Sequence, residues 1–239
     1  MISSFFNTFV YVPLYNGLIA LVDLVPWHDV GIAVILLTVL VRLVLYPLSK
    51  QAVKTQMAMK EVAPLIEELK VKYKDKQEEL ARAVFALYRE KNIRPFSSFL
   101  LILVQIPVLI GLYWVFWGGG LPSVKTEVLY SFVSAPEMVN MNFLGLVPMD
   151  ERSLLFAVCA ALTQVVYARL SMGARKPYER PETPSFTADL GQSMDLQMRY
   201  VLPVMLGVFA YIASAAVALY FVTSNLLMIA QEFAAGRRF

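Results

Sequence analysis

The chain of 239 residues is short enough for one domain or one compact membrane unit. Hydrophobic residues make up 58% of it and charged residues 16%, with a mean hydropathy of +0.60 and a net charge of +3. This composition excludes an intrinsically disordered protein, a nucleic-acid-binding tail protein and an ordinary soluble enzyme. Cys159 and His28 are the single residues of their kinds, which excludes a disulfide framework and multi-Cys or His-pair metal sites.

The pattern of residues 1–29 predicts an amphipathic helix that lies on the extracytoplasmic interface of the membrane. The segment is apolar but is interrupted by Pro13, Asn16 and Asp23, and it contains no Lys or Arg. The lack of a basic start argues against a cleavable signal peptide. A short additional span is the alternative for this segment.

Nearly uncharged runs predict five membrane spans, because a helix needs about 20 residues to cross the hydrocarbon core. Gly31–Leu48 contains a single charge, Arg42, whereas Phe96–Trp117 and Ser153–Ala168 contain none. The last run, Tyr200–Ala230, has 31 uncharged residues. It is too long for one ordinary span, and two short spans with a turn at small residues fit it better. Four spans in total is the fallback.

The distribution of Lys and Arg predicts an N-out, C-in topology. Ser49–Pro95 carries 11 basic and 7 acidic residues, and Ser171–Arg199 carries four basic residues, so both segments are expected in the cytoplasm. Gly118–Asp150 carries one basic residue and is expected outside. The chain ends in Arg237–Arg238 and Phe239, and a cytoplasmic tail there requires two spans after Ser171–Arg199.

Ser49–Pro95 predicts a cytoplasmic hairpin of two amphipathic helices. Apolar residues recur at helical spacing from Val53 to Tyr73 and from Leu80 to Tyr88, with a polar turn at 74–77 between them. Its charges fit a solvated surface that is attracted to anionic lipids. They also fit a docking platform for a ribosome or an incoming chain.

The predicted fold is therefore an all-α polytopic membrane protein, with its segments in the following order: 1–29 interfacial helix, 30–48 first span, 49–95 cytoplasmic hairpin, 96–117 second span, 118–150 outer loop, 151–170 third span, 171–198 cytoplasmic loop, 199–213 fourth span, 215–233 fifth span and 234–239 cytoplasmic tail.

Arg42 is the residue that most needs an explanation, because a charge in the middle of a span costs at least about 2.5–3.5 kcal/mol. Thr38 and Tyr46 share its helix face, and Gln105 and Gln164 add polar groups in other spans. The uncharged interiors of the spans supply no acid to pair with it. A polar, wetted groove explains the charge, and snorkelling to the interface is the alternative.

Known catalytic patterns do not match the chain. It has no phosphate-binding G-x-x-x-x-G-K-[ST] motif, and we expect no Cys–His catalytic pair, because His28 is predicted outside and Cys159 inside a span. We therefore expect no enzymatic activity, no cofactor and no specific nucleic-acid binding. Two functions stay open on the residues alone. One is a small anion transporter or channel that uses Arg42 as its binding charge, and the other is a structural assembly factor.

The order of several short motifs resembles the YidC–Oxa–Alb family of membrane protein insertases, in a short form without a large extracytoplasmic domain. The motifs are Val12–Asn16, Thr38–Ser49, Ala63–Pro64, Lys72–Asp75, Asn92–Pro95, Gln105–Pro107 and Ala218–Leu226. Tyr167 stands where the family often has a glutamine, and Tyr220–Phe221 stands where many members have an aromatic pair with two polar tips.

The resemblance implies an insertase and chaperone that works without ATP through a hydrophilic groove open to the cytoplasm and to lipid. The substrate's apolar segment would slide along the third and fifth spans. Nascent membrane proteins would be its partners, with a ribosome, a Sec translocon and anionic lipids as further candidates, and a bacterial plasma membrane its location. The groove residues would be Arg42, Thr38, Tyr46, Gln105, Gln164, Tyr167, Tyr220, Phe221 and Asn225.

Overall fold

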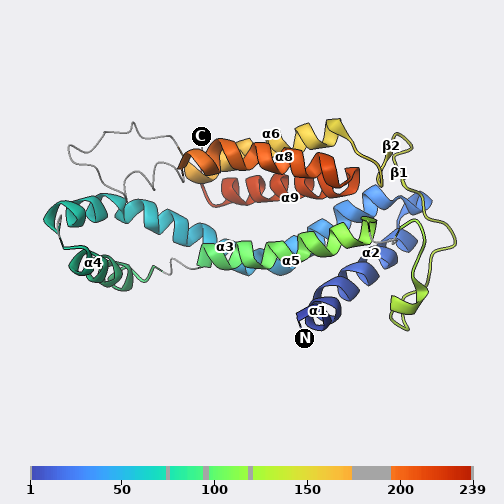
Figure 1. Ribbon diagram of the computed structural model, residues 1–239, viewed down its shortest axis with the longest axis horizontal. Helices are drawn as coiled ribbons and strands as arrows, with labels where there is room; N and C mark the ends of the chain where they lie inside the picture. Colours follow the sequence, from blue (N-terminus) through green and yellow to red (C-terminus); the bar gives the residue numbers. More distant parts are fainter. Residues whose placement is uncertain (1, 74–75, 94–96, 118–120, 174–194, 238–239) are drawn as a thin grey trace. The chain divides into compact units, whose positions relative to one another are not determined.

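A computed structural model describes residues 2–73, 76–93, 97–117, 121–173 and 195–237, and most of them are helical (Figure 1). The elements in chain order are α1 (Ile2–Phe6), the π-helical turn η1 (Asn7–Tyr11), α2 (Val12–Leu24), the short helix η2 (Pro26–His28), α3 (Val30–Lys72), α4 (Gln77–Glu90), α5 (Ser97–Trp117), the short helix η3 (Thr126–Val128), strands β1 (Asn142–Phe143) and β2 (Val147–Pro148), α6 (Leu154–Met172), the π-helical turn η4 (Gln197–Val201), α8 (Leu202–Ala213) and α9 (Ala215–Ala234). The turn at 74–77, the Arg94–Pro95 motif and the loop at 171–198 fall partly or mostly outside the described residues.

The chain forms two compact units. The first consists of Met1–Leu43 and Pro107–Phe239, and the second of Val44–Ile106. The second unit contains the polar half of α3 and all of α4, where surface ion pairs such as Lys70–Glu67 join neighbouring turns of one helix at 2.8 Å. Exposed pairs of this kind add little stability.

Four helices in the described chain are long and apolar enough to cross a membrane: Ser4–Leu24, Val30–Lys72, Leu154–Met172 and Ala215–Ala234. Two shorter apolar helices, Leu103–Phe116 and Gln197–Ala213, accompany them. The membrane class and the helical fold predicted from the sequence are thus confirmed. The N-terminal segment, which the sequence predicts on the interface, is long enough to span.

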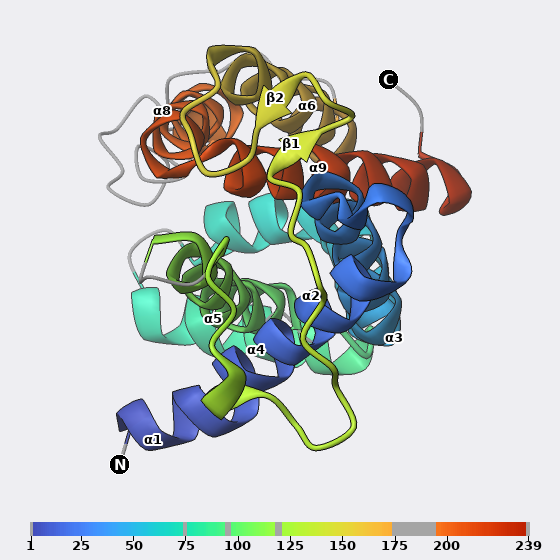
Figure 2. The same cartoon turned by 90° about the vertical axis from the view of Figure 1, so that its right-hand side faces the viewer.

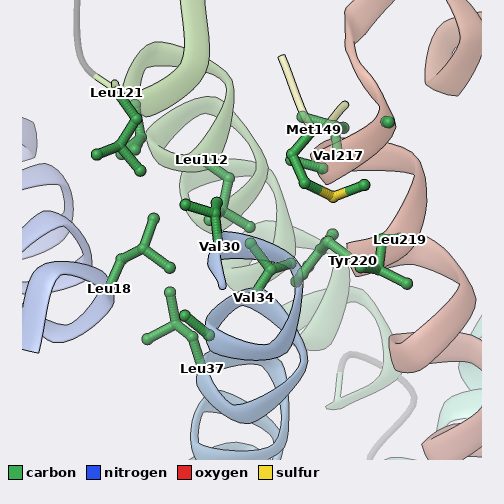
Figure 3. Close-up of a cluster of buried hydrophobic side chains, with 14 of the residues drawn as sticks. Leu18, Val30, Val34, Leu37, Leu112, Leu121, Met149, Val217, Leu219 and Tyr220 are labelled. Carbon is green, nitrogen blue, oxygen red and sulfur yellow. The ribbon is translucent and has the colours of Figure 1, made fainter. Parts of the chain in front are cut away.

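α9 lies at the centre of the first unit. Every residue from Ala215 to Phe221 is buried, and α9 packs along α6 and α8 (Figure 2). Figure 3 shows how Val217, Leu219 and Tyr220 of α9 meet Val34 of α3 and Met149 in one hydrophobic cluster. Alanines on α6 and α9 allow the helices to approach closely, which is how helices associate where lipid weakens the hydrophobic drive.

The outer surfaces of α6 and α8 remain apolar and exposed. Leu154, Leu155, Leu162, Val204, Met205 and Val208 each expose more than half of their surface. A patch of this kind on a helical protein marks a surface that contacts lipid or another apolar partner. The exposed and the buried faces of α6 and α8 are therefore both apolar, as expected for helices in a membrane.

A single extended residue, Ser214, separates α8 from α9. Its hydroxyl accepts from Val217 N at 3.4 Å and so caps α9. The first two amides of α9 donate to the segment that precedes α6, Ala215 N to Glu151 O at 2.7 Å and Ala216 N to Met149 O at 3.0 Å. The turn contains no proline, and the first three amides of α9 are hydrogen-bonded there.

The loop between α5 and α6 is held against α2 and the start of α3 by buried polar side chains. Asn16 Oδ1 accepts from Tyr130 N at 2.6 Å, and its Nδ2 donates to Val128 O at 3.0 Å. The Asp29 carboxylate accepts from Ile32 N at 3.1 Å, which caps α3, and from Leu144 N at 2.7 Å, which fixes the β1–β2 hairpin. The N-terminal segment is thus part of the folded core.

Gly31 allows that hairpin to lie on α3. A Cβ atom at Gly31 would come 2.3 Å from the ring of Phe143, a distance that no side chain tolerates. The close approach of β1 to the start of α3 therefore requires glycine at this position.

Replacement of Asn16 by Ala should lower the stability of the first unit by roughly 1–3 kcal/mol, because two loop backbone groups would lose their buried partner. The measurement is thermal unfolding in detergent. Asn7→Ala is the matched control, since Asn7 lies on the same N-terminal segment but is exposed. Equal melting temperatures for the two variants would contradict the role given to Asn16.

Candidate functional site

Arg42 lies half-buried in the apolar part of α3 and contacts α9. Its Nε donates to Ser224 Oγ at 2.9 Å, and its Nη2 donates to the same hydroxyl. The hydroxyls of Tyr167 on α6 and Tyr220 on α9 are close enough to interact electrostatically with the guanidinium. Three helices thus contribute to the Arg42 cluster, which consists of Arg42, Tyr167, Tyr220 and Ser224.

Packing between α6 and α9 places Ser224. The adjacent Asn225 is buried and donates through Nδ2 to Thr163 Oγ1 at 3.2 Å and to Ala160 O at 3.3 Å. These contacts fix the rotation of α9 against α6, so that Ser224 reaches Arg42. Asn225, a predicted groove residue, thereby serves helix packing.

The other predicted groove residues have different surroundings. The Thr38 hydroxyl donates to Val34 O on its own helix at 2.6 Å. Phe221 packs edge-on against Phe209 of α8, with ring centroids 6.3 Å apart. Gln164 is buried on α6, one turn before Tyr167. The remaining two, Tyr46 and Gln105, belong to the second unit, where Tyr46 exposes 46% of its surface.

Sequence analysis missed two parts of this region. Ser224, the partner of Arg42, is one of three consecutive polar residues in the last apolar run, Thr223–Ser224–Asn225, and this interruption is the available signal. Glu232 lies just beyond the uncharged run, yet it is buried within α9 and pairs with Arg237 at 2.9 Å. An acid is therefore present at the end of the last helix, paired with a second arginine.

An apolar pocket of about 270 Å³ lies between α5 and α8. Its lining consists of Leu109, Ile110 and Tyr113 from α5 and Phe209, Ile212 and Ala213 from α8. Among the described residues, no group of three or more His, Cys, Asp or Glu side chains could hold a metal ion. The described chain thus offers a cation with hydroxyl neighbours and, separately, an apolar pocket.

Comparison with known proteins agrees with this chemistry. Residues 22–239 match the family described as 60Kd inner membrane protein. The chain belongs to this family. The match includes Arg42, Ser224 and every residue of the α5–α8 pocket.

Relatives of the chain within the 60Kd inner membrane protein family carry the name membrane protein insertase YidC. The chain is 30% identical over 210 residues to that of Methylobacillus flagellatus, which covers 88% of the chain and 33% of the relative. It is 28% identical to that of Oceanobacillus iheyensis, in a match that covers 84% of the chain and 72% of the relative. It is also 28% identical to that of Clostridium tetani, in a match that covers 86% of the chain and 81% of the relative. The chain thus spans about a third of the Methylobacillus protein and most of the other two.

In this member of the family, Ser224→Ala should destabilise the first unit by roughly 1.5–3 kcal/mol, because a charged donor loses its acceptor. Thermal unfolding in detergent measures the loss, and the neighbouring Thr223→Ala is the control. The loss should shrink in an Arg42→Met background, where no guanidinium needs the hydroxyl. An equal loss with and without Arg42 would show that Ser224 acts elsewhere.

Proposed function

We propose that this chain is a membrane protein insertase and chaperone that passes a polar segment of its substrate along a hydrophilic groove at Arg42. The observation that carries the proposal is the charge of the Arg42 cluster. Among the described residues, the side chains that act on Arg42 are the neutral groups of Ser224, Tyr167 and Tyr220. The cluster therefore keeps a positive charge in an apolar setting.

A positive charge at this depth lowers the barrier for an acidic or polar tail that crosses the membrane. The backbone and polar side chains of such a tail lose their water in hydrocarbon, and each unsatisfied group costs several kcal/mol. A hydrated groove that ends at Arg42 shortens the dry path. Because Coulomb attraction grows as the dielectric constant falls, Arg42 attracts a carboxylate more strongly there than in water.

The pocket between α5 and α8 is the docking surface we propose for the apolar segment of the substrate. This surface lies on the second and fourth predicted spans, whereas the sequence predicts that the substrate slides along the third and fifth; the first turns of α9, from Ala215 to Phe221, are buried. Each central Leu or Ile of a substrate contributes about −0.3 to −0.6 kcal/mol to insertion. A segment of about 20 residues can therefore enter lipid without ATP hydrolysis.

The proposed topology has five spans with the N-terminus outside and the C-terminus inside a bacterial plasma membrane. The spans are the first part of α3, then α5, α6, η4 with α8, and α9. The 43 residues of α3 exceed the number needed for one crossing, so its Lys-rich half extends into the cytoplasm and forms a hairpin with α4. This hairpin would meet the anionic lipid surface, a ribosome or a Sec translocon.

Arg42→Gln should reduce insertion of a single-span substrate with an acidic N-tail by roughly tenfold, which corresponds to about 1.4 kcal/mol. Insertion of the same substrate with an uncharged tail should change little. The measurement is protease protection in liposomes that contain the purified protein. Arg42→Lys is the matched variant, since it keeps the charge and loses the fork of donors.

Normal insertion of the acidic tail by folded Arg42→Gln protein would remove the charge from the mechanism. If liposomes with the wild-type protein protect no more substrate than empty liposomes, the insertase function itself is wrong.

A photocrosslinking amino acid in place of Tyr113, which lines the α5–α8 pocket, should capture the apolar segment of a stalled substrate. The same amino acid in place of Tyr211, which lies on α8 outside the pocket lining, is the control. The expected yield is several times higher at position 113, because its side chain lines the pocket in which the apolar segment docks. A higher yield at position 211 would place the docking surface elsewhere.

An anion transporter or channel would use the same uncompensated charge of Arg42, and the same liposomes distinguish it. Such a protein would release trapped chloride or phosphate in an Arg42-dependent manner, with no substrate chain present. An insertase protects the substrate and leaves the trapped anion inside.

A further inference from the structure

The C-terminal end of α9 has a defined backbone geometry. Gly236 adopts a left-handed conformation with φ +84°. Its N–H donates to Phe233 O at 2.9 Å, and Arg237 N donates to Glu232 O at 3.1 Å. This pair of bonds is the Schellman motif, which brings the side chains of the sixth and first residues together. Here those residues are Arg237 and Glu232.

A buried ion pair occupies the place where this motif usually has an apolar contact. Glu232 Oε2 lies 2.9 Å from Arg237 Nη1, and the two side chains expose only 1% and 7% of their surface. Burial of two charges is costly unless further hydrogen bonds support them. Such support reaches Arg237 from α6.

Arg237 fastens α9 to the end of α6. Its Nη1 donates to Ser171 O at 2.8 Å, a carbonyl in the last turn of α6, where a cation also complements the helix dipole. The Ser171 side chain hydrogen-bonds Tyr167, and Tyr167 interacts electrostatically with Arg42, Glu232 and Arg237. Hydrogen bonds thus run from the end of α9 to the last turn of α6, and Tyr167, one turn earlier on α6, is within electrostatic range of Arg42.

We propose that Arg237 and Glu232 are positioning residues that act on the Arg42 cluster through Ser171 and Tyr167. The ion pair holds the last turn of α6 against the end of α9 and thereby fixes Tyr167, one turn earlier on α6, within electrostatic range of Arg42. This inference rests on the proposed insertase function, and it assigns to the pair a share in the recognition of acidic segments.

The chain offers a matched control at the same helix end. Arg199 donates to Gly173 O at 2.7 Å and pairs with Asp195 at 2.8 Å, so it also caps α6 and is also buried. Arg199 is not among the charges that act on Tyr167 within the described chain. Loss of Arg199 should therefore weaken the end of α6 without a selective effect on the Arg42 cluster.

The test is a double-mutant cycle between Arg237→Met and Tyr167→Phe in the liposome assay, with an acidic-tail and an uncharged-tail substrate. We expect each single variant to lower acidic-tail insertion relative to uncharged-tail insertion by at least about threefold. The double variant should lose no more than the worse single variant, because both act through one hydroxyl. Arg199→Met should leave the ratio of the two substrates unchanged.

Two results would overturn the positioning role. One is that Arg237→Met lowers both substrates in equal proportion, as expected of a capping residue alone. The other is that the losses of Arg237→Met and Tyr167→Phe multiply. If thermal unfolding shows that Arg237→Met does not fold, Glu232→Gln replaces it in the same cycle, because it keeps the side-chain shape and removes the charge that holds Arg237.

Failure of this inference is distinguishable from failure of the proposed function. The positioning role alone is overturned if the wild-type protein inserts both substrates and Arg237→Met and Arg199→Met give the same ratio of acidic-tail to uncharged-tail insertion. A wild-type protein that inserts neither substrate overturns the proposed function, and the positioning role with it.

Discussion

The hydrogen bond between Arg42 and Ser224 is the interaction on which the proposed site depends. A guanidinium in an apolar helix must find acceptors or return to water, and the Ser224 hydroxyl is an acceptor that does not cancel the charge. A carboxylate in its place would form a neutral pair with no remaining attraction for a substrate. Neutral partners therefore lower the cost of burying the Arg42 guanidinium and leave its positive charge able to attract a substrate.

Rigid packing behind Ser224 makes that hydrogen bond possible. The alanine-rich half of α9 is buried against α6 and α8, and Asn225 is bonded to Ala160 and Thr163. Small side chains bring the backbones close, and one amide fixes the rotation of the helix. The proposed docking pocket lies between α5 and α8 instead, beside apolar faces that stay exposed. Close packing and open apolar surface thus occupy different sides of the same unit.

The sequence predicted the helical membrane class and the family because both rest on features that are local in the chain. Long apolar runs indicate helices in a membrane, and short motifs in a fixed order identify the family. The partner of Arg42 could not be predicted, because Thr223, Ser224 and Asn225 are equally polar and only the rotation of α9 decides which one faces α3. Glu232 was missed because it follows the uncharged run, although its spacing to Gly236–Arg237 is the spacing of a Schellman motif.

The position of Glu232 also shows why a buried acid at the end of α9 does not neutralise Arg42. The Schellman geometry commits this carboxylate to Arg237, whose backbone is fixed five residues away. The acid is thus bound at the end of its own helix, and Arg237 carries the connection to α6 through the Ser171 carbonyl. Two arginines and one acid then leave one net positive charge, and the one without a carboxylate partner in the described chain is Arg42. An acidic substrate segment is the partner that we propose for this remaining charge.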